Sequence, residues 1–398
     1  MEVPGFYGAA VEAGIKYKDR LDLGVIFSKP SCNLAAVFTR NIVKAAPVLD
    51  SIAVIERSSS FRAIVVNSGN ANACTGKQGL RDCESIRKRA SQLLDCKEEE
   101  VLVASTGVIG AFLPMGKYLA GLERACLSLR EDGLLDVSQA ILTTDTRHKV
   151  AMRQVEGRGT PITIFGMAKG AGMIGPNMGP PQATMLAFVL TDAVVDPEFW
   201  QSVLEDAVDA SFNRITVDGD TSTNDTVLAL ANGHARNQVI DGQETLSEGF
   251  KQALYDILQS LAEQIVMDGE GATKCVRISV RGAASDEDAR VCASTVSNSP
   301  LVKTAFFGQD PNWGRIIAAA GRSGAYFDPN KVTITVGGIK VADRGVSLGQ
   351  EAEKAAAEKM KKSRFDVELD LGAGKAEYSM LTCDLSTEYV HINADYRT

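Results

Sequence analysis

Two apolar runs separated by a loop rich in glycine and proline constrain the fold more than any other part of the sequence. Residues 163–167 are apolar and β-branched, and residues 185–190 form an unbroken apolar run. An apolar run of that length without alternation predicts a strand buried on both faces. The intervening loop ends at Thr184, the polar residue directly before the second run. The sequence therefore predicts a loop that delivers one hydroxyl group to the edge of a buried sheet.

The same loop contains a misleading motif. Gly170, Gly172 and Gly175 spell the GxGxxG pattern of a dinucleotide-binding turn. That pattern binds a pyrophosphate only where a helix begins at the glycines. Prolines at 176, 180 and 181 occupy the stretch where the helix would run. Since a proline inside a helix costs roughly 3 kcal/mol, the sequence argues against a nucleotide site.

Composition excludes several classes of function. The 398 residues carry a net charge of −8, which argues against nucleic-acid binding and against a basic membrane-surface protein. No apolar run approaches the roughly 20 residues that span a bilayer, and the N-terminus lacks a signal-peptide pattern. Eight cysteines without a CxxC pair and only three histidines predict reduced, mostly buried thiols in a cytoplasmic enzyme without a metal site.

Short strands and amphipathic helices alternate along the chain and predict an α/β fold with helix-covered sheets. In the first part of the chain we expect strands at 23–27, 35–39, 61–66 and 100–104, and helices from 82 and around 119–129. Further helices are expected at 199–211 and 250–265. The strand–helix pattern restarts at Val276, which predicts a larger domain over residues 1–275 and a smaller α/β domain over residues 276–398.

Several motifs together resemble the ornithine acetyltransferase family, also called glutamate N-acetyltransferases, which act in arginine biosynthesis. They are KGAGMIGPNM from Lys169, ATML from Ala183, TTDT ending at Thr146, DGDTSTND from Asp218 and DPNWGR from Asp310. The resemblance extends over nearly the whole chain. One departure is the segment Gly179-Pro-Pro-Gln182, which separates two motifs that usually adjoin in the family.

The resemblance implies a layered helix–sheet–sheet–helix domain of the N-terminal-nucleophile type and self-cleavage between Ala183 and Thr184. Thr184 then becomes the N-terminal nucleophile, and the alpha and beta fragments assemble as a heterotetramer with two copies of each. The implied reaction moves acetyl from N-acetylornithine to glutamate through acetyl-Thr184 in a ping-pong cycle. No cofactor is implied, and acetyl-CoA stays open as a second acetyl donor.

Other site residues are implied by the same resemblance. Thr106 and Gly107 end a predicted strand, where a hydroxyl and a backbone N–H can face one developing oxyanion, and the family forms its oxyanion hole from such a pair. By charge, Lys169 suits a substrate carboxylate and Glu270 a substrate amino group. The implied substrate-binding positions are Thr146, Lys169, Thr184, Glu270, Asn393 and Thr398.

Ordinary structural roles stay open for some of these residues. Thr184 can simply begin a strand, Thr106 and Gly107 can form a plain turn, and Arg315 can be structural or substrate-binding. The acidic residues between 218 and 225 lack the spacing of an EF-hand loop, so we expect a turn there. An N-terminal-nucleophile amidase, in which water accepts the acyl group, is the main alternative function, and a non-catalytic amino-acid-binding protein is the other.

Overall fold

The computed structural model describes residues 1–156, 161–175, 178–179 and 185–395. Contacts within the chain divide it into two compact units. Among the described residues, unit 1 comprises Met1–Asn213 and Asp220–Ile265, and unit 2 comprises Arg214–Gly219 and residues 266–395. These units differ from the predicted division at 275/276 in two segments, 214–219 and 266–275.

The long strand β2 (Leu23–Thr39) connects the two sheets that are layered in unit 1, so that their nine strands form one continuous hydrogen-bonded series. Its first part pairs with β1 (Phe6–Val11) and β3 (Phe61–Asn67), and its last part pairs with β10 (Thr226–Ala231). The prediction of two separate strands at 23–27 and 35–39 is therefore wrong. The residues between them continue the strand while its neighbour changes, with a shift of register opposite β3.

The remaining strands of unit 1 extend these two sheets. The first sheet continues from β3 to β4 (Val101–Ser105). The second continues from β10 through β8 (Leu186–Thr191) and β6 (Pro161–Lys169) to β5 (Lys149–Glu156). Every residue of β8 is buried, which confirms the buried strand predicted from the apolar run. The short strand β7 (Met178–Gly179) pairs with the end of β2.

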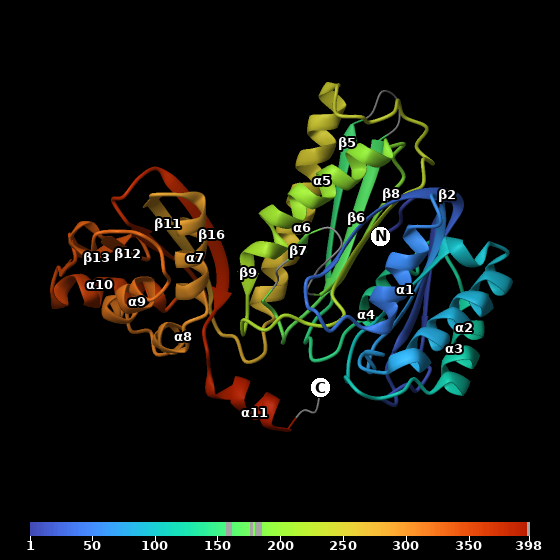
Figure 1. Cartoon of the computed structure of the whole chain (residues 1–398), viewed down its shortest axis with the longest axis horizontal. Coiled ribbons are helices and arrows are strands. Elements are labelled where there is room, and N and C mark those ends of the chain that lie inside the picture. Colours follow the sequence, from blue (N-terminus) through green and yellow to red (C-terminus); the bar gives the residue numbers. More distant parts are fainter. Residues whose placement is uncertain (157–160, 176–177, 180–184, 396–398) are drawn as a thin grey trace. The chain divides into compact units, whose positions relative to one another are not determined.

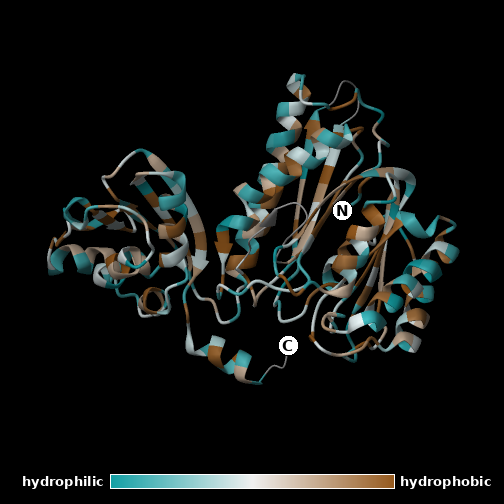
Figure 2. Cartoon of the chain, viewed as in Figure 1, coloured by the Kyte–Doolittle hydropathy of each residue, from teal (hydrophilic) through white to brown (hydrophobic). Residues whose placement is uncertain are grey.

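Helices cover the outer faces of both sheets, while buried side chains from both sheets fill the space between them (Figure 1). On the first sheet, α2 (Gly76–Leu94) and α3 (Met115–Leu127) pack against the strands. On the second, Trp200 of α5 (Pro197–Ala210) donates a 3.0 Å hydrogen bond to a β10 carbonyl, and its ring contacts that of Phe250 of α6 (Thr245–Met267) at a tilt. This order of layers confirms the predicted helix–sheet–sheet–helix fold. Figure 2 shows the apolar residues concentrated along the strands.

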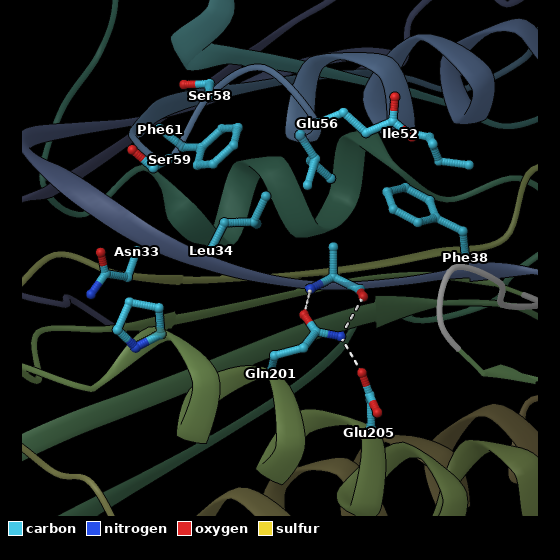
Figure 3. A pocket seen from close by; sticks show the side chains of 13 residues that line it. Asn33, Leu34, Phe38, Ile52, Glu56, Ser58, Ser59, Phe61, Gln201 and Glu205 are labelled. Atoms are coloured by element: carbon cyan, nitrogen blue, oxygen red, sulfur yellow. Dashed lines mark hydrogen bonds between the residues drawn. The ribbon is translucent and has the colours of Figure 1, made fainter.

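A side chain closes part of the free edge of β2. Gln201 accepts a 2.9 Å hydrogen bond from the Ala36 N–H and donates a 3.1 Å hydrogen bond to the Ala36 carbonyl (Figure 3). The amide of Gln201 thus pairs with Ala36 as the backbone of a neighbouring strand would. Beside it lies a cavity of about 670 Å³ whose walls include Leu34, Phe38 and Glu205. Two further helices of unit 1 are α1 (Ala46–Ile55) and α4 (Leu134–Ala140).

Unit 2 is built on its own mixed sheet, in the order β14-β13-β12-β15-β11-β16-β9. In chain order the strands are β9 (Ile215–Thr216), β11 (Cys275–Ala283), β12 (Thr333–Val336), β13 (Ile339–Asp343), β14 (Val346–Ser347), β15 (Arg364–Asp370) and β16 (Ala376–Cys383). The helices are α7 (Asp286–Ser297), α8 (Pro300–Phe307), α9 (Trp313–Gly321), α10 (Gln350–Met360) and α11 (Thr387–Asp395). Residues 387–395 thus form a helix.

Two residues of the DPNWGR motif have structural contacts in unit 2. Trp313 begins α9 and packs, partly buried, against the core. Arg315 donates a 2.9 Å hydrogen bond to the Leu301 carbonyl, which favours the structural role for this arginine.

All eight cysteines are free thiols. Five of them are buried: Cys32, Cys83, Cys275, Cys292 and Cys383. This agrees with the prediction of reduced and mostly buried thiols. In the described part of the chain, no helix is both long and apolar enough to cross a membrane.

Candidate active site

Thr106 lies in the turn directly after β4, and polar side chains hold this turn in place. The Thr106 N–H donates to the Asn67 carbonyl at 3.0 Å. The Ser105 hydroxyl donates to the side-chain oxygen of Asn67 at 2.7 Å, and the Asn224 amide donates to the Ser105 carbonyl at 2.8 Å. Because three hydrogen bonds to two separate segments of unit 1 hold it, the backbone that carries Thr106 is fixed in position.

Gly107 occupies a position that requires glycine. Its φ is +133°, and a Cβ atom there would lie 2.3 Å from the carbonyl carbon of Gly69. L-residues rarely adopt this φ, and the contact is far below van der Waals distance. The turn therefore brings the backbone of residue 107 very close to the asparagine-rich turn at 67–72.

Lys169, the last residue of β6, brings a cation to this turn. Only 8% of the residue is exposed, and its ammonium nitrogen lies 3.4 Å from the Thr106 hydroxyl oxygen. The register of β6 and β8 pairs Lys169 with Leu186, two residues after Thr184. The structure thus brings Thr106, Gly107 and Lys169 together in unit 1, beside the strand that follows the predicted nucleophile.

Asp145 is a residue of this candidate site that the sequence did not indicate. Its side chain is fully buried, and its carboxylate lies 2.7 Å from the Lys149 ammonium and 4.0 Å from the Lys169 ammonium. The Gly170 N–H also donates to it at 2.7 Å. Burial alone would raise the pKa of Asp145, but the ammonium groups of Lys169 and Lys149 hold that pKa well below its usual value. The carboxylate is therefore ionised at neutral pH. The available signal was the TTDT motif, in which only Thr146 was singled out.

The other predicted site residues of unit 1 and the chain end are not part of this buried cluster or are not described. Thr146 is exposed in unit 1, directly after Asp145. Ala183, Thr184 and Thr398 lie outside the described residues, so the cleavage site and the nucleophile stay predictions.

The structure also bears on the alternatives to an acyl-transfer site. No helix begins at the glycines of residues 170–175, so the GxGxxG pattern lacks the helix that a dinucleotide site needs. Within the described ranges, no group of three or more histidine, cysteine, aspartate or glutamate side chains is arranged to hold a metal ion.

Glu270 and Asn393 meet in unit 2. The Asn393 amide donates a 2.8 Å hydrogen bond to Oε2 of Glu270, and Glu270 is only 7% exposed. The neighbouring Gly271 accepts a 2.6 Å hydrogen bond from the Ser386 hydroxyl, just before α11. Glu270 is therefore a buried, hydrogen-bonded acid rather than a solvated one, and two predicted substrate-binding residues are direct neighbours.

Comparison with known proteins shows the family. The ArgJ family model matches residues 7–398. The arginine biosynthesis bifunctional proteins ArgJ of Geobacter sulfurreducens and Desulfotalea psychrophila are 49% and 48% identical, each over 100% of both chains. A crystal structure of the protein of the same name from Bacillus halodurans is 41% identical, with a TM-score of 0.51, over 54% of this chain and 100% of that chain. These matches confirm the resemblance drawn from the motifs, and the chain belongs to the ArgJ family.

Proposed function

We propose that this protein is a glutamate N-acetyltransferase of arginine biosynthesis, which moves acetyl from N-acetylornithine to glutamate through acetyl-Thr184. The observation that carries the proposal is membership of the ArgJ family over residues 7–398, whose curated relatives are named for arginine biosynthesis. The 3.4 Å contact between Lys169 and Thr106 supports it, because it joins a cation to a candidate oxyanion donor at one buried turn.

The first half-reaction uses a hydroxyl that is weakly nucleophilic without a base. Cleavage before Thr184 supplies that base, since a free α-amine titrates near about 7.7–8.0 and is well placed for proton transfer. The Thr184 oxygen attacks the acetyl carbonyl of N-acetylornithine, and its proton passes to the α-amine. Thr106 and Gly107 stabilise the tetrahedral oxyanion by hydrogen bonding. The C–N bond then breaks, the departing nitrogen takes the proton, and ornithine leaves acetyl-Thr184.

The second half-reaction reverses these steps with glutamate. Its amino group attacks the ester carbonyl, the acyl C–O bond to Thr184 breaks, the α-amine passes the proton of the attacking amino group to the Thr184 oxygen, and N-acetylglutamate leaves. Both substrates carry a carboxylate, for which Lys169 is the proposed partner, and Glu270 is the proposed partner of an amino group. Thr146, Asn393 and Thr398 complete the proposed binding site. Because the ester conserves the acyl bond, the transfer needs no cofactor.

The decisive experiment incubates the wild-type protein with N-acetylornithine, with and without glutamate, and follows ornithine release. We expect release that depends on glutamate, with an equal amount of N-acetylglutamate formed. Thr184→Ser, which keeps a hydroxyl, is expected to retain part of the activity that Thr184→Ala loses. Free acetate that appears equally fast without glutamate would show that water is the acceptor, and an amidase would replace the transferase.

Two finer features belong to the same proposal. The relatives are named bifunctional, which supports acetyl-CoA as a second acetyl donor. An assay of thiol release from acetyl-CoA in the presence of glutamate tests this activity. The cleaved fragments are proposed to form a cytoplasmic heterotetramer, so light scattering should give about twice the 42.4 kDa of one chain. A mass equal to one chain would contradict that assembly.

A further inference from the structure

We propose that Asp145 is a positioning residue of the oxyanion hole. It holds Lys169 so that the ammonium donates to Thr106, which directs the Thr106 hydroxyl proton toward the oxyanion. This inference rests on the proposed acyl transfer and adds to it a residue and a role, because the resemblance gave Lys169 only a substrate carboxylate to bind.

Hydrogen bonds to both carboxylate oxygens hold the Asp145 side chain in one orientation. One carboxylate oxygen, Oδ1, accepts from the Lys149 ammonium and from the Gly170 N–H, both at 2.7 Å. The other, Oδ2, accepts from the Thr143 N–H at 3.0 Å and lies 4.0 Å from the Lys169 ammonium. With its side chain fully buried and both oxygens engaged, the carboxylate cannot rotate without losing several hydrogen bonds.

The chemistry of the groups fixes the direction of the contact between Lys169 and Thr106. An ammonium group has three donors and no acceptor, whereas a hydroxyl has one donor and two acceptor lone pairs. In the 3.4 Å contact, Lys169 therefore donates and the Thr106 oxygen accepts. The hydroxyl proton must then point to another acceptor. Hydrogen bonds in series polarise one another, so the ammonium makes Thr106 a stronger donor.

The charge of Lys169 also favours a developing anion. Lys149 is completely buried and lies closer to Asp145 than Lys169 does. The charge of Lys169 is left without a second carboxylate among the ion pairs of the described residues. Positive charge in a water-poor site stabilises a transition-state oxyanion more than it would in water. Lys169 places such a charge 3.4 Å from the Thr106 hydroxyl oxygen.

The test compares Asp145→Asn with Asp50→Asn. Asp50 is also a buried carboxylate of unit 1, but its partner is Arg87, at 2.9 Å. The readout is the rate of acyl-enzyme formation from p-nitrophenyl acetate, normalised to cleaved protein by mass spectrometry. Asp145→Asn should lower this rate at least about tenfold with little change in KM, since loss of a whole oxyanion donor costs about 10²–10³. Asp50→Asn should lower the melting temperature and leave the rate unchanged.

A double-mutant cycle separates positioning from a general structural effect. In a Thr106→Val background, Asp145→Asn should lower the rate less than about twofold, because coupled residues are not additive. Asp145→Glu keeps the charge and serves if the asparagine variant does not fold. It should also slow acylation in the wild-type background and not in Thr106→Val. Equal losses in both backgrounds would overturn the proposal.

The same assay distinguishes a failure of the proposed role of Asp145 from a failure of the proposed function. A normal burst from p-nitrophenyl acetate without glutamate-dependent ornithine release would overturn glutamate as the acceptor while still testing Asp145. A wild-type protein that forms no acyl-enzyme at all would overturn both.

Discussion

The amide of Asn393 donates a 2.8 Å hydrogen bond to Oε2 of Glu270, a residue 123 positions earlier in the chain. Asn393 lies on α11, Glu270 lies just after α6, and both residues belong to unit 2. The contact fixes the orientation of the buried Glu270 carboxylate, the proposed partner of a substrate amino group.

Asn393→Ala should therefore weaken substrate binding. We expect KM for glutamate and N-acetylornithine to rise about tenfold or more, as a hydrogen bond to a charged group contributes about 1.5–3 kcal/mol. Turnover should change little if the contact is equally strong in the ground state and the transition state. Asn330→Ala, which removes an exposed amide bonded to Asp328, is the control. A fall in kcat without a change in KM would contradict a binding role.

Thr106→Ala tests the oxyanion donor. Turnover should fall by about 10²–10³, the usual effect of removing one such donor, while the circular dichroism spectrum stays that of the wild type. Thr106→Ser keeps the hydroxyl and should retain most of the turnover. If Thr106→Ala has wild-type kcat, Thr106 and Gly107 form only a structural turn.

Thr184→Ala tests self-cleavage. The wild-type protein should give fragments 1–183 and 184–398, which stay associated because the fully buried strand β8 follows the cut. The variant should remain a single 42.4 kDa chain without transferase activity. Intact mass spectrometry distinguishes the two results. A wild-type protein that is full-length and fully active would contradict the cleavage prediction.

Gly107→Ala should destabilise the fold more than Gly110→Ala. Both glycines have positive φ, but a Cβ at 107 would lie 2.3 Å from backbone, whereas a Cβ at 110 would meet nothing within 4 Å. Strain from the backbone alone costs about 1–2 kcal/mol, so this is the expected loss at 110. Urea denaturation should give a clearly larger loss at 107. Equal losses would mean that the turn can relax.

One cysteine should react quickly with thiol reagents. Cys74 is exposed, whereas burial raises the pKa of Cys32 and of Cys126 to about 12 and that of Cys96 to about 11. Only the thiolate is nucleophilic, so these three thiols stay unreactive at neutral pH. Titration with a chromogenic disulfide should give one fast thiol, lost in Cys74→Ser, and eight after denaturation. Fast labelling that persists in Cys74→Ser would contradict this burial pattern.

The sequence by itself determined those elements whose burial follows from the local pattern of apolar and polar residues. The unbroken apolar run predicted β8, and the strand–helix alternation predicted the α/β class, because periodicity records which faces of an element leave water. The prolines after Gly175 excluded a dinucleotide turn for an equally local reason. The motifs around Lys169, Ala183 and Asp310 were enough to identify the family, since a motif is also a local pattern.

Only the tertiary structure decided which residues meet. Lys169 contacts Thr106 across 63 positions, and β2 is one strand because its neighbours change along its length. In the sequence, Asp145 is an ordinary acid in a polar motif. In the structure, two lysine ammonium groups and two backbone N–H groups surround its carboxylate. A buried ion pair or a strand register depends on groups far away in the chain. No local pattern can encode that, because desolvation and pairing are settled only when distant segments pack together.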